Sequence, residues 1–272
     1  MHPLIKKILL EIIKESQSSL GRKPSQDNEH YLDKILMVLY SDIKWKYLEG
    51  PLYHDTYRKK FQYWANELNV FEKTHEIICT LLQDKFYNHN LLNKLFMDSS
   101  DILNKNGYEC TGRSKKYKFK KATKINIITD QYGIILAIKI VPANKNDSIL
   151  TEETLDNIKV KIIHSRKYPK YLITDKGYIN KKTKKKLEKK INLIYPDRKN
   201  CVNSPYNYTQ NIKRKELLKK RYINENAFSW LKNSKRTTIR CDRLLCTFKG
   251  FIYLQALKHI GTKIDILKIN LS

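Results

Sequence analysis

The sequence predicts an α+β (α/β) fold, in which a helical N-terminal domain, residues 1–90, precedes a mixed five-stranded sheet with flanking helices in residues 91–272. Two features predict this division. Apolar residues recur at helical spacing through the first part, whereas runs of β-branched residues bounded by turn signals begin near residue 94. With 272 residues, of which 41% are hydrophobic, the chain can bury a substantial core.

The N-terminal domain is expected to be helical throughout. The expected helices cover residues 3–20, 27–39, 55–68 and 72–86. The third carries an aromatic stripe of Tyr57, Phe61 and Trp64 beside the basic residue Arg58. Such a stripe is most often core packing, but its basic flank also makes Arg58 a candidate for contact with DNA. Both interpretations remain open at this point.

Residues 91–272 are expected to follow the order three strands, helix, strand, helix, strand, helix. The expected strands cover residues 94–98, 124–130, 134–141, 171–175 and 192–196. The expected helices cover residues 148–158, 180–190 and 221–236, and the polar residues 197–213 are expected to form a loop. This is the order of elements in ribonuclease H-like folds.

Two of the expected strands end in an aspartate, Asp98 and Asp175. The carboxyl ends of strands are where open sheets place ligand-binding groups. On adjacent strands these carboxylates would offer the hard oxygen ligands that Mg²⁺ or Mn²⁺ prefers, and Glu225 on a nearby helix would complete the site. Taken singly, an aspartate that ends a strand is more often a turn former or a helix cap. The remaining candidates are Asp101, Asp147 and Asp197 in reserve, and Asp130, at a hairpin turn, as a structural residue.

The third carboxylate lies in a strongly basic helix expected over residues 221–236. At 100° per residue, one stripe of this helix carries Arg221, Glu225, Lys232 and Arg236. A solvated basic helix with an incidental glutamate is the alternative interpretation, because charged faces are common on surface helices. Beside two strand-terminal aspartates, the stripe would instead hold phosphates next to bound metal ions, and an arginine can do so bidentately.

The charge of the chain favours a polyanionic partner, most economically nucleic acid. There are 54 Lys and Arg residues against 27 Asp and Glu, a formal net charge of +27. Basic clusters at residues 113–121, 181–190 and 213–221 suggest a surface that follows DNA, and the first is interleaved with Tyr117 and Phe119. The cysteines and histidines are scattered, which disfavours structural zinc or disulfides, and no apolar run is long enough to span a membrane.

Several segments resemble one family, in order and with matching spacing over about residues 30–260. The matching segments are parts of the helical leader, Gly112-Arg113-Ser114, a first-Asp motif at Met97-Asp98-Ser99-Ser100, a second-Asp motif at residues 174–178, and Arg221, Glu225 and Lys232 in a Tyr-(2)-Arg-(3)-Glu-(6)-Lys signature. On these residues the chain resembles DDE transposases of the bacterial insertion-sequence type, within groups four and five. It departs from the signature at Leu218, where the family has Tyr.

The resemblance implies a metal-dependent transposase with a ribonuclease H-like fold, in which Asp98, Asp175 and Glu225 are the catalytic residues and metal ligands. Two Mg²⁺ or Mn²⁺ ions would serve cleavage at transposon ends and strand transfer by the freed 3′-hydroxyl, so the three carboxyl groups should converge to within about 4–8 Å. The residues expected to contact DNA are Arg221, Lys232, Arg236, Lys176, Arg113, Lys115 and Arg58.

The expected partners are double-stranded DNA, as transposon ends and target, and a second copy of the chain on that DNA. No membrane partner is expected, and the protein should act in an intracellular compartment that contains DNA. Two alternatives share much of this evidence. A catalytically inactive or domesticated relative would bind DNA without metal-dependent nicking, and a ribonuclease H-like nuclease would cleave without joining a 3′ end to a target.

Overall fold

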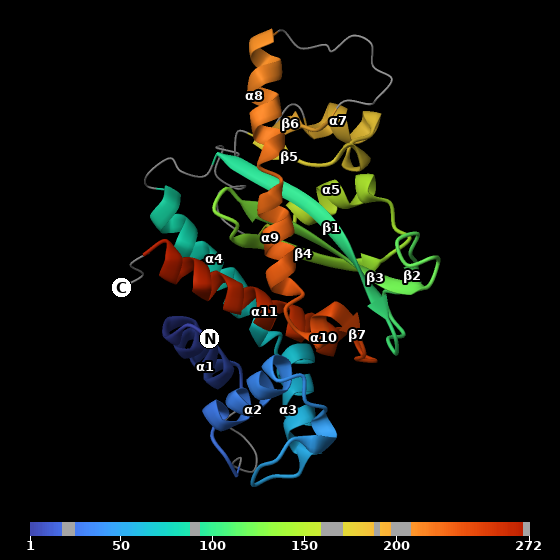
Figure 1. Cartoon of the computed structure of the whole chain (residues 1–272). Helices are drawn as coiled ribbons and strands as arrows, with labels where there is room; N and C mark the ends of the chain where they lie inside the picture. Colours follow the sequence, from blue (N-terminus) through green and yellow to red (C-terminus); the bar gives the residue numbers. More distant parts are fainter. Residues whose placement is uncertain (18–24, 88–92, 159–170, 188–190, 197–207, 269–272) are drawn as a thin grey trace.

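A mixed sheet lies at the centre of the molecule, with helices on both faces and a group of N-terminal helices at one end (Figure 1). The structure is a computed structural model that describes residues 1–17, 25–87, 93–158, 171–187, 191–196 and 208–268. Three expected segments lie partly outside these ranges: residues 197–207 of the expected loop 197–213, the last residues of the expected helix 180–190, and most of the loop after residue 20. None of the helices in the described part combines the length and apolarity needed to cross a membrane.

The N-terminal part consists of helices, as expected from its periodicity. They are α1 (Pro3–Ser16), α2 (Asn28–Tyr40), the 3₁₀ turn η1 (Trp45–Tyr47), α3 (His54–Asn66) and α4 (Val70–Tyr87). Asp27 caps α2, because its carboxylate accepts a hydrogen bond from the backbone N–H of His30 at 2.7 Å. The aromatic stripe of α3 is fully buried, which confirms its packing role.

The five predicted strands are all present. In the described residues the strands are β1 (Lys94–Asn104), β2 (Gly112–Arg113), β3 (Lys121–Asp130), β4 (Ile135–Pro142), β5 (Tyr171–Ile173), β6 (Asn192–Ile194) and β7 (Ile239–Arg240). The main sheet has the order β4-β3-β1-β5-β6, and the short strands β2 and β7 pair with β3 and β1. Pairs β4–β3 and β3–β1 are antiparallel, while β1–β5 and β5–β6 are parallel. The predicted mixed, ribonuclease H-like α+β fold is confirmed.

Helices cover both faces of the sheet. They are α5 (Asp147–Leu155), the 3₁₀ turn η2 (Lys176–Tyr178), α7 (Lys181–Leu187), α8 (Tyr208–Lys219), α9 (Tyr222–Leu231), α10 (Lys235–Thr238) and α11 (Leu245–Ile266). Neighbouring residues of β1 show which helix lies on which face, since alternate side chains point in opposite directions. Ser99 contacts Asp147 of α5, whereas Ser100 contacts Lys232 at the end of α9. Helices α5 and α9 therefore lie on opposite faces.

Three predicted boundaries differ most from the structure. Strand β1 does not end at Asp98 but continues to Asn104, because residues 99–103 keep pairing with β3. The expected helix 221–236 ends at Leu231, and Lys232 leaves the helical conformation before the short α10 begins at Lys235. Finally, α8 begins at Tyr208 and so occupies part of the expected loop; its buried Leu217 packs against Phe96 and Ile173 of the sheet.

One apolar cluster joins the N-terminal helices to the sheet. It includes buried residues of α1, α2 and α3 together with Ile102 of β1, Ile125 of β3 and many residues of α11. The rings of Phe61 in α3 and Phe251 in α11 are 4.4 Å apart between centroids. Helix α11 is therefore one element through which the helical leader contacts the rest of the chain. The division into two domains at residue 90 remains a prediction.

Gly250 allows the close approach of α11 and α3. A Cβ atom at this position would lie 2.9 Å from Cζ of Phe61 and 3.1 Å from Cβ of Ala65. We expect Gly250→Val to lower the free energy of unfolding by about 1–3 kcal/mol through overpacking, which corresponds to a fall in Tm of about 3–10 °C. Calorimetry would measure it. Gly177→Ala is the control, because its added Cβ would meet only Asp147, at 3.8 Å; an equal Tm loss in both variants would contradict the packing argument.

Candidate active site

The sheet register places Asp98 and Asp175 side by side. Strands β1 and β5 are parallel, with Lys94 opposite Tyr171 and Phe96 opposite Ile173. Asp98 and Asp175 each lie two residues beyond the last of these pairs, and adjacent strands are about 4.8 Å apart. Asp175 directly precedes η2, and its carboxylate accepts a hydrogen bond from the N–H of Lys176 at 2.7 Å. The two aspartates predicted from the sequence therefore meet at one level of the sheet.

Asp98 is held in a way that disfavours its charge. Its side chain is half-buried, and one carboxylate oxygen accepts a hydrogen bond from the N–H of Ser99 at 2.8 Å. Burial raises the pKa of Asp98 above the ordinary value of 3.8, and the negative charges of Asp175 and Asp147 add to that effect, against the hydrogen bond and the positive charge of Arg221. The charged form of Asp98 is thus short of compensating positive charge.

Helix α9 presents its basic edge to these strands. Arg221 lies just before α9, with one guanidinium nitrogen 3.9 Å from a carboxylate oxygen of Asp175. Lys232, just after α9, donates a hydrogen bond from its ammonium group to the hydroxyl of Ser100. Glu225 lies on the same edge of the helix between these two residues, since positions i, i+4 and i+11 fall within about 40° of one another. Its side chain is exposed.

Asn224 is the residue that sequence reasoning missed. It is buried against the sheet, 2.7 Å from the hydroxyl of Thr129. With its amide oriented so that both side-chain atoms are paired, it also accepts hydrogen bonds from the N–H groups of Met97 and Asp98, at 3.2 and 3.3 Å. Asn224 thus fixes the helix carrying Glu225 to the strand carrying Asp98. The available signal was its helical spacing of i, i+3, i+4 and i+7 with the apolar Ala227, Phe228 and Leu231.

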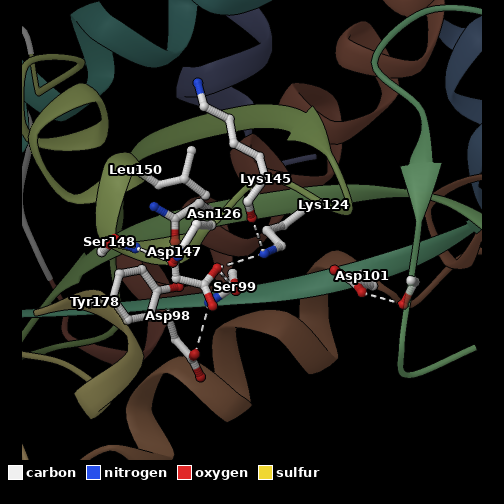
Figure 2. Close-up of polar contacts among 12 residues, drawn as sticks. Asp98, Ser99, Asp101, Lys124, Asn126, Lys145, Asp147, Ser148, Leu150 and Tyr178 are labelled. Carbon is white, nitrogen blue, oxygen red and sulfur yellow. Dashed lines mark hydrogen bonds and ion pairs between the residues drawn. The ribbon is translucent and has the colours of Figure 1, made fainter. Parts of the chain in front are cut away.

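A second network supports the aspartates from the opposite face of β1. Asp147 at the start of α5 accepts hydrogen bonds from Lys124 at 2.7 Å and from the hydroxyl of Ser99 at 3.2 Å. Figure 2 shows the carboxyl group of Asp98 pointing away from this pair. The hydroxyl of Tyr178, at the end of η2, donates to Asn126 of β3 at 2.8 Å. The network therefore anchors both the backbone beside Asp98 and the turn that follows Asp175.

The other acidic candidates have structural partners. Lys124, only 9% exposed, pairs with Asp147. Asp101 accepts a short hydrogen bond from Ser114. Asp130 is buried in the hairpin between β3 and β4, where it accepts hydrogen bonds from the N–H groups of Tyr132 and Ile134, both at 2.9 Å; this is the structural position expected of it. Asp197 lies outside the described residues.

The convergence expected of the three carboxyl groups is not seen in this structure. Among the residues that the structure describes, no three His, Cys, Asp or Glu side chains are grouped closely enough to hold a metal ion. The donor set nevertheless fits divalent ions, because Asp98 and Asp175 supply carboxylate oxygens at one level with unbalanced negative charge. The exposed Glu225 lies on the edge of α9 that faces both.

The residues expected to contact DNA divide into three groups. Arg221 and Lys232 flank the aspartates, and Lys176 is exposed next to Asp175. Arg113 and Lys115 are exposed at and just after β2.

The third group, Arg58 and Arg236, has partners within the protein. Arg58 in α3 forms an ion pair with Asp55 at 2.8 Å. The side chain of Arg236 is 12% exposed and lies 3.3 Å from Asp242, over the rings of Trp45 and Phe251. In this structure Arg236 therefore packs the chain after α9 against the helical leader.

The chain is similar to one known protein family and to several solved structures. A family model described as the transposase DDE domain matches residues 90–249. The catalytic domain of Mos1 mariner transposase is similar at 14% identity over 72% of this chain and 90% of that one, with a TM-score of 0.30. A pre-cleavage Mos1 transpososome is similar at 13% identity over 91% and 82%, also with a TM-score of 0.30. No curated protein matches the sequence.

The family match includes both strand aspartates and the whole of α9 with its basic edge. It covers more than half of the 272 residues. The protein is therefore a transposase that belongs to the transposase DDE domain family.

Proposed function

We propose that this transposase cuts DNA at the ends of its element and joins the freed 3′ ends to target DNA, at one site formed by Asp98, Asp175 and Glu225. The observation that carries the proposal is the level placement of the two aspartates on adjacent parallel strands, beneath the edge of α9 marked by Arg221 and Lys232. Membership of the transposase family supports the choice of DNA over other phosphodiesters.

The carboxylates would hold two divalent ions, Mg²⁺ or Mn²⁺. Bound there, the ions would supply stabilisation of the attacking and leaving oxygens of an in-line displacement. Asp98 and Asp175 would bind from the sheet. Glu225 would join them from α9 when the ions bind, because three carboxylates repel one another without that positive charge.

Arg221 and Lys232 would position the DNA strand. Their backbone positions lie on either side of Glu225 along one edge of the helix, about 16 Å apart along its axis at 1.5 Å per residue. That distance matches several successive phosphates of one strand. Arg221 already contacts Asp175, so it would bind the phosphate nearest the carboxylates, and Lys232 a phosphate further along.

The wider surface would bind double-stranded DNA through its positive charge. The net charge of +27 and the exposed cations Lys176, Arg113 and Lys115 favour counterion release, so affinity should fall steeply with salt. Transposition requires two DNA ends to be held together. We therefore propose a homodimer on DNA, on mechanistic grounds.

The first test is metal-dependent cleavage of DNA that carries the inverted repeats flanking the gene. We expect nicking in Mg²⁺ or Mn²⁺ and none in chelator. Asp175→Asn should reduce cleavage at least about 1,000-fold, because it removes an ion ligand needed by the displacement. Asp156→Asn, the same change at an exposed position at the end of α5, is the matched control and should cleave normally. Full cleavage by the Asp175 variant would contradict the site; DNA binding by the wild type without nicking in any metal would indicate an inactive relative.

The second test uses stability. Since the folded state raises the pKa of Asp98, the contribution of this residue to stability is present at low pH and is lost as pH rises from about 4 through the higher folded value. Without metal, Asp98→Asn should therefore have a higher Tm than wild type at pH 7–8, and the difference should disappear in acid. The amide oxygen can still accept the hydrogen bond from Ser99.

Adding Mn²⁺ should reverse that order. The ions should raise the Tm of the wild type by binding the folded state, but should leave the Asp98 variant unchanged. Thermal scans over pH, with and without Mn²⁺, measure both effects. A lower Tm for the variant in metal-free neutral buffer would show that the charge on Asp98 is well compensated in the folded protein.

A further inference from the structure

An exposed aromatic ring stands among lysines in the turn between β2 and β3. The side chain of Phe119 is 62% exposed. Four lysines in the same turn are also exposed: Lys115, Lys116, Lys118 and Lys120. Single exposed apolar side chains are common on protein surfaces, but a ring encircled by cations is not a surface for packing against an apolar partner.

The turn is held in place by its own hydrogen bonds. The N–H of Phe119 donates to the carbonyl of Ser114 at 2.7 Å, and the N–H of Ser114 donates to the carbonyl of Lys120 at 3.0 Å. The hydroxyl of Ser114 donates to the carboxylate of Asp101, and that of Tyr117 to the carbonyl of Asp101 at 3.2 Å. Two side chains thus anchor the turn to β1, and Figure 2 shows the Asp101 bond.

The backbone at the tip adopts a conformation that favours glycine. Lys118 and Phe119 have φ angles of 50° and 62°, two successive non-glycine residues in the left-handed region. Such residues cost stability and persist where the surrounding structure determines them, often at binding sites. The exposed ring of Phe119 gains little from packing in return. The cost is explained if the ring has a partner outside the chain.

The turn lies beside the candidate active site. Asp101, its anchor, is three residues beyond Asp98 on β1, about 10 Å away at 3.3 Å per residue. On the α9 side, the pKa of Lys232 is lowered first by burial and then by the positive charge of Lys116. Lys116, in the turn, therefore lies near the end of the basic edge. A distance of 10 Å equals about three base-pair steps of DNA.

We propose that Phe119 stacks on an unpaired base of the bound DNA, at least about three base-pair steps from the bond being cut. The surrounding lysines hold the phosphates of the same strand. Aromatic rings stack on bases of any identity, and cations beside them bind the backbone. Apolar side chains also enter base steps and open them. The turn would thus favour DNA that is already partly unpaired. The identity of the ligand as DNA rests on the proposed function.

The test compares two short duplexes of one sequence, one fully paired and one with a single unpaired base, in chelator so that no cleavage occurs. Wild-type protein should bind the duplex with the unpaired base about tenfold more tightly, which is the gain expected from one base–aromatic stack. Phe119→Ala should bind both duplexes equally. Lys118→Ala should weaken both by the same factor and reduce the salt dependence. If Phe119→Ala keeps the wild-type preference, or if the wild type has none, the proposal is wrong.

Two further variants separate a binding role from a folding role. Phe119→Gly should lose the preference for the unpaired base but raise Tm by about 2 °C, because glycine adopts positive φ without strain. A fall in Tm of several degrees would show that the ring supports the fold and would overturn the proposal. Ile266→Ala, which truncates a 66% exposed side chain at the end of α11, is the control and should leave both duplex affinities unchanged.

The outcome is independent of the cleavage assay. Asp175→Asn should lose nicking and keep the preference for the unpaired base. A protein that never nicks DNA yet loses the preference on Phe119→Ala would refute the proposed catalysis and support the binding role. A protein that nicks normally but shows no preference for the unpaired base would support the proposed catalysis and refute the binding role of Phe119.

Discussion

The parallel pairing of β1 with β5 is the contact on which the candidate site depends. Only three residue pairs are involved, between Lys94–Phe96 and Tyr171–Ile173. A shift of one residue would turn every side chain of β5 to the other face and separate the two aspartates. Packing on both sides prevents this shift. Leu217 of α8 packs against Phe96 and Ile173 on one face, and Tyr178 is tied to Asn126 on the other.

The same arrangement has an electrostatic free-energy cost. Register and burial bring like charges together at Asp98 and Asp175, and Arg221 opposes them from a distance that only partly compensates. Removing charged groups from water costs free energy unless each is paired, so the fold holds Asp98 in a form that favours neutralisation or a bound cation. The turn at Phe119, between β2 and β3, follows the same logic, since two successive residues have positive φ angles there. Both features lower the stability locally, and the packing of the large apolar core offsets that cost.

Much of this architecture could be predicted from the sequence, and the errors have physical causes. Residues 124–130 and 134–141 are rich in β-branched side chains, and both predicted strands are present in the structure. The continuation of β1 was missed because Ser99, Ser100 and Asp101 are weak strand formers, and their pairing with β3 is set by tertiary contact. The end of α9 was missed because the helical spacing of charged residues continues past Leu231 in the sequence. In the structure Asn233 and Ser234 interrupt the helix, and Arg236 pairs with Asp242. The charged stripe already allowed an exposed Glu225, but no sequence pattern could reveal that the three carboxylates do not form one group among the described residues.

Leu218 connects these observations. The family signature has Tyr three positions before Arg221, whereas Leu218 is partly buried against the small cluster of Phe96, Ile173 and Leu217. Those residues belong to the strands whose register aligns the aspartates. An apolar side chain at 218 therefore adds to the packing between the α8–α9 junction and the β1–β5 pair, and it removes a hydroxyl that could have contacted a phosphate. Because Arg221 follows directly after that junction, the position of its guanidinium at Asp175 depends on apolar packing, and in the proposed function Arg221 would hold the nearest phosphate without help from position 218.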